Sequence, residues 1–371
     1  ICRKIYTHSF RIGDSPPGWE INYATEFHMT NDSKLFHPKE KWETKGYRPD
    51  VFGRWIGPDG EVALPLYEGR MIGQFDFSQK GWVSGKGRSA VWREIPFENK
   101  VIEPQFLMEE KGYQKNRRGP LEEIKVAYMR ITSATNARSL IATELDNVPC
   151  EVNATKNQPL FLSTLLNSLT FDYALRTRLG GITLNWFILE ECPLPHFIQM
   201  LNEIEDLRFL RLVTIAGMLS LIHRRFAPEW LKLKKLYPEL CEREWKHWWA
   251  VIEADRLRLR VEIDALAADL YGLDPEDFDW IVRDDPTDPK GFWRVDKQLP
   301  FRERLTGLAA VAFRALKEGK WSADTAAPLT NDDFFALLRR WIDEHRAGVV
   351  TTPAAEAIAA EVAGRSLQPL F

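Results

Sequence analysis

Leu-Pro-Leu-Tyr-Glu-Gly-Arg-Met-Ile-Gly-Gln-Phe-Asp-Phe, residues 64–77, is the stretch on which the expected fold of this chain depends. Val62, Leu64 and Leu66 alternate with other residues, as apolar side chains do along a half-buried strand. The Tyr-Glu-Gly-Arg segment that follows indicates a turn, because glycine commonly interrupts a strand where the chain turns. The stretch therefore predicts a strand that ends in a turn carrying one exposed cation, Arg70.

The strand signal extends over residues 61–195. Apolar alternation recurs around Val126 and Tyr128, and a series of glycines interrupts the pattern where turns are expected. One segment, residues 158–178, departs from this pattern, because its apolar side chains recur at helical spacing. Residues 61–195 are thus expected to form a mainly antiparallel β domain with one inserted helix.

The segments on either side differ from this β-rich region. Residues 1–60 are rich in proline, glycine, aspartate and aromatic residues without a clear period, which predicts an extended connector. Residues 196–371 turn to helical periodicity and are expected to form a helical domain. Asp274 and Thr330 have the residue types of N-terminal caps. The expected helices cover residues 197–224, 229–271, 302–318, 331–346 and 353–364, so the chain as a whole is expected to have an α+β fold.

Composition bounds the class of protein. The chain is 44% hydrophobic and 28% charged, which is ordinary for a globular protein, and its net charge of −3 argues against binding a polyanion over the whole surface. The four cysteines lie far apart without Cys-x-x-Cys spacing, so neither a zinc site nor a disulfide framework is indicated, and a cytoplasmic location is expected. The longest uncharged apolar stretch, Leu212 to Ile222, is too short to cross a bilayer, so no membrane partner is expected.

Several blocks of the sequence resemble, in the same order, blocks found downstream of the catalytic domain in large adenine-N6 DNA methyltransferases. These relatives are the type IIG and IIL restriction-modification proteins and the methylases of the BREX and DISARM phage-defence systems. Pro65 to Met71 is similar to their Pro-Leu-Tyr-Glu-Gly-Lys-Met block, and Phe27 to Ser33 to their Phe-Asp-Met-Thr-Asn-Asp-Ser block, with His28 in place of the acid. The further blocks are residues 130–142, 166–168, 171–173, 175–176, 192–195, 271–273 and 294–297.

The resemblance implies that the chain is the DNA-reading part of such an enzyme, with double-stranded DNA as its partner. Adenine-N6 methylation requires an Asn/Asp-Pro-Pro-aromatic loop, and the sequence has only Ser15-Pro16-Pro17-Gly18. Residues 84–88 are better interpreted as a hairpin or a basic loop tip than as a cofactor loop. Because the sequence begins at Ile1, we expect a fragment that holds no cofactor itself. A methyltransferase domain that binds S-adenosylmethionine would lie upstream in cis.

Basic residues concentrate between Lys111 and Arg138, where seven lysines and arginines accompany two glutamates. Such a face attracts phosphates, and counterion release makes the attraction depend on salt. Arg70 and Arg138 lie beside expected strands, and a rigidly held arginine fork can address guanine just as an asparagine amide can address adenine. The expected DNA-binding residues are Tyr67, Arg70, Lys86, Arg88, Lys115, Arg117, Arg118, Arg130, Asn136 and Arg138.

Plainer alternatives exist for these assignments. Residues 114–119 are also typical of a solvated hairpin loop, and Arg70 has Glu68 and Asp76 nearby in sequence as partners for a surface ion pair. At the level of function, two alternatives stay open. The helical region is also suited to docking a subunit of a defence complex, and the chain is long enough to contain a hydrolase or nuclease site that carries no familiar motif.

Asn167, Asp172 and Arg176 form a second group of polar residues, on the expected helix of residues 158–178. Their offsets place them on one side of that helix. We interpret them as a structural polar network that ties the helix to the sheet, rather than as a functional site.

We predict that the chain neither binds S-adenosylmethionine nor methylates DNA, because the residues that would hold the cofactor and stack on adenine are missing. Calorimetric titration with S-adenosylmethionine should show no saturable heat, with an intact adenine-N6 methyltransferase as the positive control. Stoichiometric binding in the micromolar range would contradict the prediction.

Overall fold

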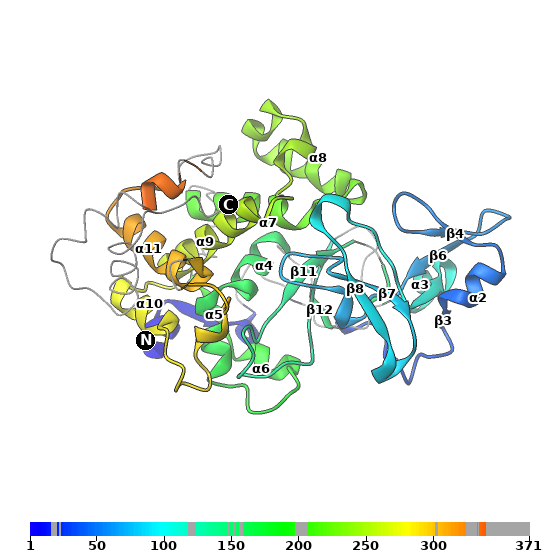
Figure 1. Ribbon diagram of the computed structural model, residues 1–371, viewed down its shortest axis with the longest axis horizontal. Helices are drawn as coiled ribbons and strands as arrows, with labels where there is room; N and C mark the ends of the chain where they lie inside the picture. Colours follow the sequence, from blue (N-terminus) through cyan, green and yellow to red (C-terminus); the bar gives the residue numbers. More distant parts are fainter. Residues whose placement is uncertain are drawn as a thin grey trace.

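The computed structural model describes residues 1–15, 21, 24–117, 124–146, 148–150, 153–155, 159–196, 206–300, 303–323, 332 and 334–338. These residues form an α+β fold, as the sequence predicts. The two larger sheets and a β-hairpin gather toward one end of the molecule, and most of the helices gather toward the other (Figure 1).

The stretch that begins at Leu64 opens on the central strand of a five-stranded sheet. β6 (Val62–Pro65) pairs antiparallel with β9 (Phe106–Glu109), with Leu64 opposite Met108, and both side chains are buried. The strand order is β3 (Phe36–Pro38), β9, β6, β5 (Trp55–Ile56), β4 (Arg48–Pro49), and every neighbouring pair is antiparallel. Two short helices, α2 (Lys39–Thr44) and α3 (Glu110–Asn116), directly follow β3 and β9.

A second, four-stranded sheet lies between the first sheet and the helices. Its order is β11 (Ala142–Leu145), β10 (Lys125–Tyr128), β12 (Asn153–Thr155), β2 (Ala24–Thr25), again antiparallel throughout. Every residue of β10 and β11 is buried. This happens because α4 (Pro159–Asn167) packs on both strands, which places the inserted helix against the face of the sheet.

The first 60 residues are not the extended connector that composition predicts, because they contribute five strands. β2 to β5 belong to the two large sheets, and β1 (Ser9–Arg11) pairs antiparallel with β13 (Pro193–Pro195). Short irregular strands of this kind lack the length over which alternation is visible in a sequence. A separate hairpin consists of β7 (Lys80–Ser84) and β8 (Val91–Glu94), and the chain starts with α1 (Cys2–Thr7).

The helix expected at residues 158–178 is present but divided. α4 ends at Asn167, and α5 (Leu169–Arg176) begins after Ser168, whose Oγ accepts a hydrogen bond from the N–H of Phe171 at 3.2 Å. Serine is a favoured N-cap, since its side chain satisfies a backbone donor that the new helix leaves unpaired. α6 (Trp186–Glu190) follows after a loop.

The helices after residue 206 match the periodicity of the sequence except where proline intervenes. The expected helix at residues 229–271 is wrong as a single element: α8 (Ala227–Leu236) stops before Pro238, and α9 (Glu253–Leu270) starts later. A residue before proline avoids helical angles, and proline donates no hydrogen bond. Asp274 caps α10 as predicted, and its carboxylate accepts from the N–H of Asp277. The remaining helices are α7 (Leu207–Ser220), α10 (Pro275–Val282) and α11 (Leu305–Lys317).

Parts of the expected helical region lie outside the described residues. Thr330 and residues 353–364 are among them, and of residues 331–346 the structure describes 332 and 334–338. The apolar core extends across residue 195, the expected domain boundary. A single cluster of buried side chains contains Ile5, Val126, Leu166, Ile263 and Phe334.

A buried polar network connects the β-rich part of the chain to α5. The carboxylate of Asp172, fully buried on α5, accepts hydrogen bonds from Arg138 Nε (3.1 Å), the N–H of Ser139 (3.0 Å) and Arg176 Nε (3.0 Å). Asn167 joins the first residue of β11 through its Oδ1 and its Nδ2, at 3.0 and 2.9 Å. We call Arg138, Asn167, Asp172 and Arg176 the Asp172 network. It confirms the expected tie between helix and sheet.

Arg176 extends the Asp172 network into the helical part. Its Nη2 donates to the carbonyls of Asn136 (3.0 Å) and Ala137 (2.8 Å), and its Nη1 donates to the carbonyl of Lys290 (2.8 Å). The guanidinium carbon lies 4.1 Å from the ring centroid of Phe292. One side chain therefore fixes a loop of the β-rich part and a loop of the helical part at once.

We predict that Asp172→Ala destabilises the protein by roughly 3–5 kcal/mol, because it leaves buried guanidinium groups without their counter-charge. Urea unfolding would measure the change. The control is Asp14→Ala, which removes an exposed ion pair with Arg11 at 2.8 Å and should hardly move the midpoint. Equal shifts for the two variants would show that the Asp172 network does not support the fold.

A second buried acid, Glu144 on β11, lies outside the Asp172 network. Ser163 Oγ donates to Glu144 Oε1, while Oε2 has no hydrogen-bond partner in the part of the chain that the structure describes. Burial raises the pKa of Glu144 from its ordinary value of 4.5 to about 7. The carboxyl group is therefore neutral in the folded protein in mildly acidic solution.

Glu144 should make the protein less stable as the pH rises. The pKa of Glu144 is higher in the folded protein than in the unfolded chain. The stability that Glu144 contributes is therefore complete below pH 4.5 and is lost as the pH rises through about 7. The loss is on the order of 3 kcal/mol. We expect Glu144→Gln to remove this part of the pH dependence of the unfolding free energy in urea. Glu94→Gln, an exposed position on β8, is the matched control and should keep it.

Candidate nucleic-acid interface

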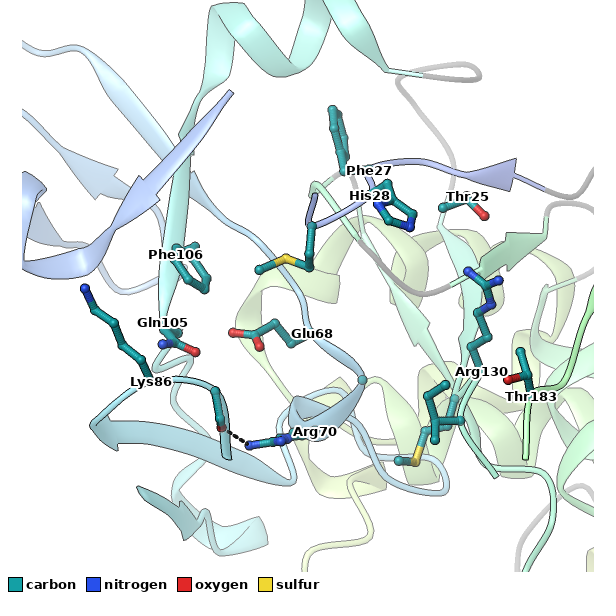
Figure 2. A pocket seen from close by; sticks show the side chains of 15 residues that line it. Thr25, Phe27, His28, Glu68, Arg70, Lys86, Gln105, Phe106, Arg130 and Thr183 are labelled. Carbon is teal, nitrogen blue, oxygen red and sulfur yellow. Dashed lines mark hydrogen bonds between the residues drawn. The ribbon is translucent and has the colours of Figure 1, made fainter. Parts of the chain in front are cut away.

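Strand ends from both large sheets surround a hollow of about 710 Å³. Residues 27–29 reach it after β2, residues 68–70 after β6, and residues 129–131 after β10. The remaining lining comes from residues 86–87, residues 105–106, Thr25 and Thr183 (Figure 2). We call this space the cationic hollow, because Arg70, Lys86 and Arg130 all line it.

The segment at residues 27–29 is positioned by a turn that His28 holds. The His28 N–H donates to Asp32 Oδ2 at 2.7 Å, and His28 Nδ1 accepts from the backbone N–H groups two and three residues further on, at 3.2 and 3.4 Å. A carboxylate at position 28 accepts such bonds too, so the imidazole replaces the acid of the resembling block without loss of the turn. Phe27 is left 1% exposed, with its ring 6.1 Å from that of Tyr113 on α3.

The turn after β6 directs Tyr67 inward and Arg70 outward. The Tyr67 N–H donates to the carbonyl of Pro149 (2.9 Å), its hydroxyl accepts from Arg225 Nη1 (3.4 Å), and burial raises its pKa. Tyr67 is thus a core residue that DNA cannot reach, contrary to the prediction. Arg70, in the 3₁₀ turn Gly69–Met71, is exposed, and its Nη1 donates to the carbonyl of Gly87 at 3.3 Å.

Lys86 and Arg88 lie at the tip of the β7–β8 hairpin, as residues 84–88 predict. Gly85 has φ +79°, and a Cβ there would lie 2.4 Å from the backbone oxygen of Ser89, so the tip closes this tightly only with glycine. Both basic side chains are exposed. The Arg70–Gly87 hydrogen bond links the hairpin tip to the turn after β6.

Arg130 enters the cationic hollow from the opposite wall (Figure 2). Its carbonyl accepts from the N–H of Leu184 at 2.7 Å, and an isolated antiparallel bridge pairs Ile131 with Thr183. Arg130 Nε is buried without a hydrogen-bond acceptor among the described residues. The backbone of Arg130 is therefore held in place, and its guanidinium keeps hydrogen-bonding capacity.

The charges of the cationic hollow are unbalanced. Arg70, Lys86 and Arg130 form no salt bridge with a carboxylate that the structure describes, whereas the buried Lys125 holds Glu26 at 2.6 Å. The one acid of the lining, Glu68, points into the hollow (Figure 2). Asp76, a candidate partner for Arg70, pairs instead with Lys100 at 2.8 Å. Three cations against one carboxylate favour an anionic ligand.

Other predicted contact residues lie elsewhere. Arg138 belongs to the buried Asp172 network, with only 8% of its side chain exposed, and is excluded from a surface site. Asn136 is exposed on the loop after Arg130, outside the lining of the cationic hollow. The expected base-reading pair Arg70 and Arg138 therefore does not share one surface.

The expected basic patch of residues 111–138 does not form one face. Its first part is a helix rather than a hairpin loop, with Lys115 exposed on α3 and Arg117 half-buried at the end of that helix. Lys125 is enclosed by Glu26 and Tyr113; burial lowers its pKa, but these groups outweigh burial and raise it. Arg118 lies outside the described residues.

Sequence reasoning missed the uncharged and acidic members of the cationic hollow. Phe27, Met29 and Glu68 belong to blocks that carry the family resemblance, so those blocks held a signal for them. Gln105 and Phe106 stand at the start of β9 in no recognisable motif. Their place follows from strand pairing between residues far apart in the chain, which a single sequence does not specify.

Among the residues that the structure describes, no three His, Cys, Asp or Glu side chains are grouped so that they could hold a metal ion. Within the same residues, no helix has both the length and the apolar character needed to cross a membrane.

In comparisons with known proteins, no family model matches the chain, and neither a curated protein nor a solved structure matches it. The geometry of the site and the resemblance of short blocks are therefore what a functional proposal rests on.

Proposed function

We propose that this chain recognises double-stranded DNA through the cationic hollow and the hairpin tip, as the target-recognition part of a site-specific adenine-N6 DNA methyltransferase. One observation carries the proposal. Three separate blocks that resemble this family, at residues 27–33, 65–71 and 130–142, each contribute lining residues to the same hollow. These blocks are 30 to 60 residues apart in sequence, and their meeting at one hollow supports a shared site as the origin of the resemblance.

The charges support a polyanionic partner. Arg70, Lys86 and Arg130 line the hollow without acidic partners among the described residues, and Arg88 is exposed on the adjoining tip. A chain whose net charge is −3 attracts phosphates only where such cations gather. Phosphate contacts of this kind would hold the duplex in register while other groups read its bases.

The four cations differ in how firmly they are held. Arg130 is held at its backbone, where its carbonyl accepts from the N–H of Leu184, and Arg70 by its bond to the Gly87 carbonyl, which suits the directional contacts that distinguish bases. Lys86 and Arg88 are exposed at a hairpin tip and suit phosphates. In the parent enzyme, an upstream domain in cis would bind S-adenosylmethionine and receive the target adenine. The proposed setting is the cytoplasm of a cell with a restriction or phage-defence system.

A second candidate function, docking of a protein subunit, is favoured by a specific surface of the helical part. Leu231 and Leu236 on α8 are 71% and 64% exposed. Leu236 also borders an apolar groove of about 590 Å³ that Phe161 and Val213 help to line. Exposed apolar side chains beside a groove are typical of an interaction surface.

We predict that the chain binds duplex DNA with a Kd on the order of 10⁻⁴ to 10⁻⁶ M at physiological salt, and more weakly as salt rises. Lys86→Ala and Arg88→Ala should weaken binding on all sequences and make the salt slope shallower by about one unit each. Fluorescence anisotropy with a labelled duplex at several salt concentrations measures both effects. Lys235→Ala, an exposed cation on α8 outside the hollow, is the control.

Arg70→Ala and Arg130→Ala should instead relax sequence preference, by roughly 1–3 kcal/mol of discrimination at one position of the site. Selection of bound duplexes from a randomised pool measures the sequence preference of each variant. Binding that does not respond to salt, or its absence at low salt, would contradict DNA recognition and favour the docking function.

A further inference from the structure

The cationic hollow contains more apolar surface than a phosphate site needs. Its apolar lining consists of Phe27, Met29, Phe106, Met129 and Ile131, which come from three segments of the chain. Phosphates bind to cations on an open polar face and gain nothing from aromatic or thioether side chains. A ligand that uses both parts of the lining has a flat apolar body and an anionic group.

The geometry of Phe106 suits a stacked ring. Its own ring lies 5.7 Å from that of Phe36, nearly edge-on, at an interplanar angle of 67°. This contact holds one edge of Phe106, and the residue also lines the hollow (Figure 2). Aromatic side chains that are fixed in this way form platforms for nucleic-acid bases, because every base has a π face.

We infer that the cationic hollow binds a single unstacked nucleotide, with its base beside Phe106 and its phosphate at Lys86, which lies on the same side of the hollow (Figure 2). The volume of about 710 Å³ lies within the range of pockets for molecules of this size. The nucleotide is either one displaced from a bound duplex, which rests on the proposed function, or a free nucleoside monophosphate, which does not.

Two polar side chains inside the hollow point to a preference among bases. The carboxylate of Glu68 faces the interior and can accept a hydrogen bond from an exocyclic amino group, as carboxylates do from cytosine. Gln105 is buried, and its Nε2 donates to the carbonyl of Gly85 at 3.3 Å, which fixes the amide. Bases that carry an exocyclic amino group, namely adenine, cytosine and guanine, should therefore bind better than thymine.

The rim of the hollow supplies apolar groups that can take the place of a displaced base. Ile131 is 65% exposed and Ile182 is 69% exposed, and the N–H of Thr132 donates to the Ile182 carbonyl at 3.0 Å, which brings the two together. Apolar side chains inserted at a base step are a known means of unstacking a duplex. Because the two isoleucines lie beside the hollow, they can fill the gap in the duplex when the displaced nucleotide enters it.

The test compares two duplexes that differ by one unpaired 2-aminopurine nucleotide. We expect the chain to bind the bulged duplex about tenfold more tightly than the fully paired one, and to shield the fluorescent base from acrylamide quenching. Phe106→Leu, which keeps an apolar side chain in β9, should lose most of both effects. Phe187→Ala, at an exposed aromatic residue that does not line the hollow, is the matched control.

A second variant keeps the test informative if Phe106→Leu does not fold. Glu68→Gln should leave binding of the bulged duplex intact but reduce the preference for an unpaired adenine over an unpaired thymine. Urea midpoints near that of the natural protein show that each variant is folded. A separate titration with dAMP and TMP tests the free nucleotide as the source.

The outcomes distinguish the inference from the proposed function. If the paired duplex binds with the salt slope set by Lys86 and Arg88, but the bulge gives no advantage and dAMP does not bind, the nucleotide site is refuted and DNA recognition stands. If dAMP binds and no duplex does, the nucleotide site stands and DNA recognition falls. If the bulged duplex is preferred but Phe106→Leu and Phe187→Ala behave alike, the preference arises outside the hollow and the inference is wrong.

Discussion

The carboxylate of Asp172 is the contact on which the arrangement of this chain depends. It is fully buried and accepts hydrogen bonds from Arg138 and Arg176, and Arg176 continues to Lys290 in the helical part. Buried charges carry a large desolvation cost, so they persist only where partners and hydrogen bonds are nearly complete. The loop that these arginines hold is the one that follows Arg130. The network inside the molecule therefore fixes one wall of the cationic hollow on its surface.

Sequence patterns predicted the parts of the fold whose signals are local. Alternation placed β6, helical spacing placed α4 with α5, and the residue type of Asp274 predicted the cap of α10. The failures have physical causes of a different kind. The strands of residues 1–60 are two or three residues long, too short for a period to mark them, and the partners of β1, β2 and β3 lie far along the chain. Periodicity alone continued a helix across Pro238, where backbone chemistry ends it.

The candidate site was only partly predictable, because a sequence shows where cations are but not which of them have partners. Lys125 and Glu26 are 99 residues apart, and their pairing takes Lys125 out of the expected basic patch. Arg138 is likewise removed from the surface, by its buried ion pair with Asp172. Arg70 and Lys86, by contrast, were expected contacts and do line one hollow. What no pattern indicated is Phe106, which strand pairing places on the apolar side of that hollow.

Ion pairs elsewhere in the chain make the lack of carboxylate partners at the three cations of the hollow informative. The chain has 53 acidic residues against 50 basic ones, so carboxylates are not scarce, and buried cations such as Lys100 and Lys125 each have one. Around the cationic hollow, Arg70, Lys86 and Arg130 have none among the described residues. Although acidic residues are abundant, none of those described pairs with these three cations. The cations therefore create a local positive potential around one apolar space, on a chain whose net charge is −3. Such a potential orients an approaching polyanion toward this one place, and the apolar lining then decides which part of it enters.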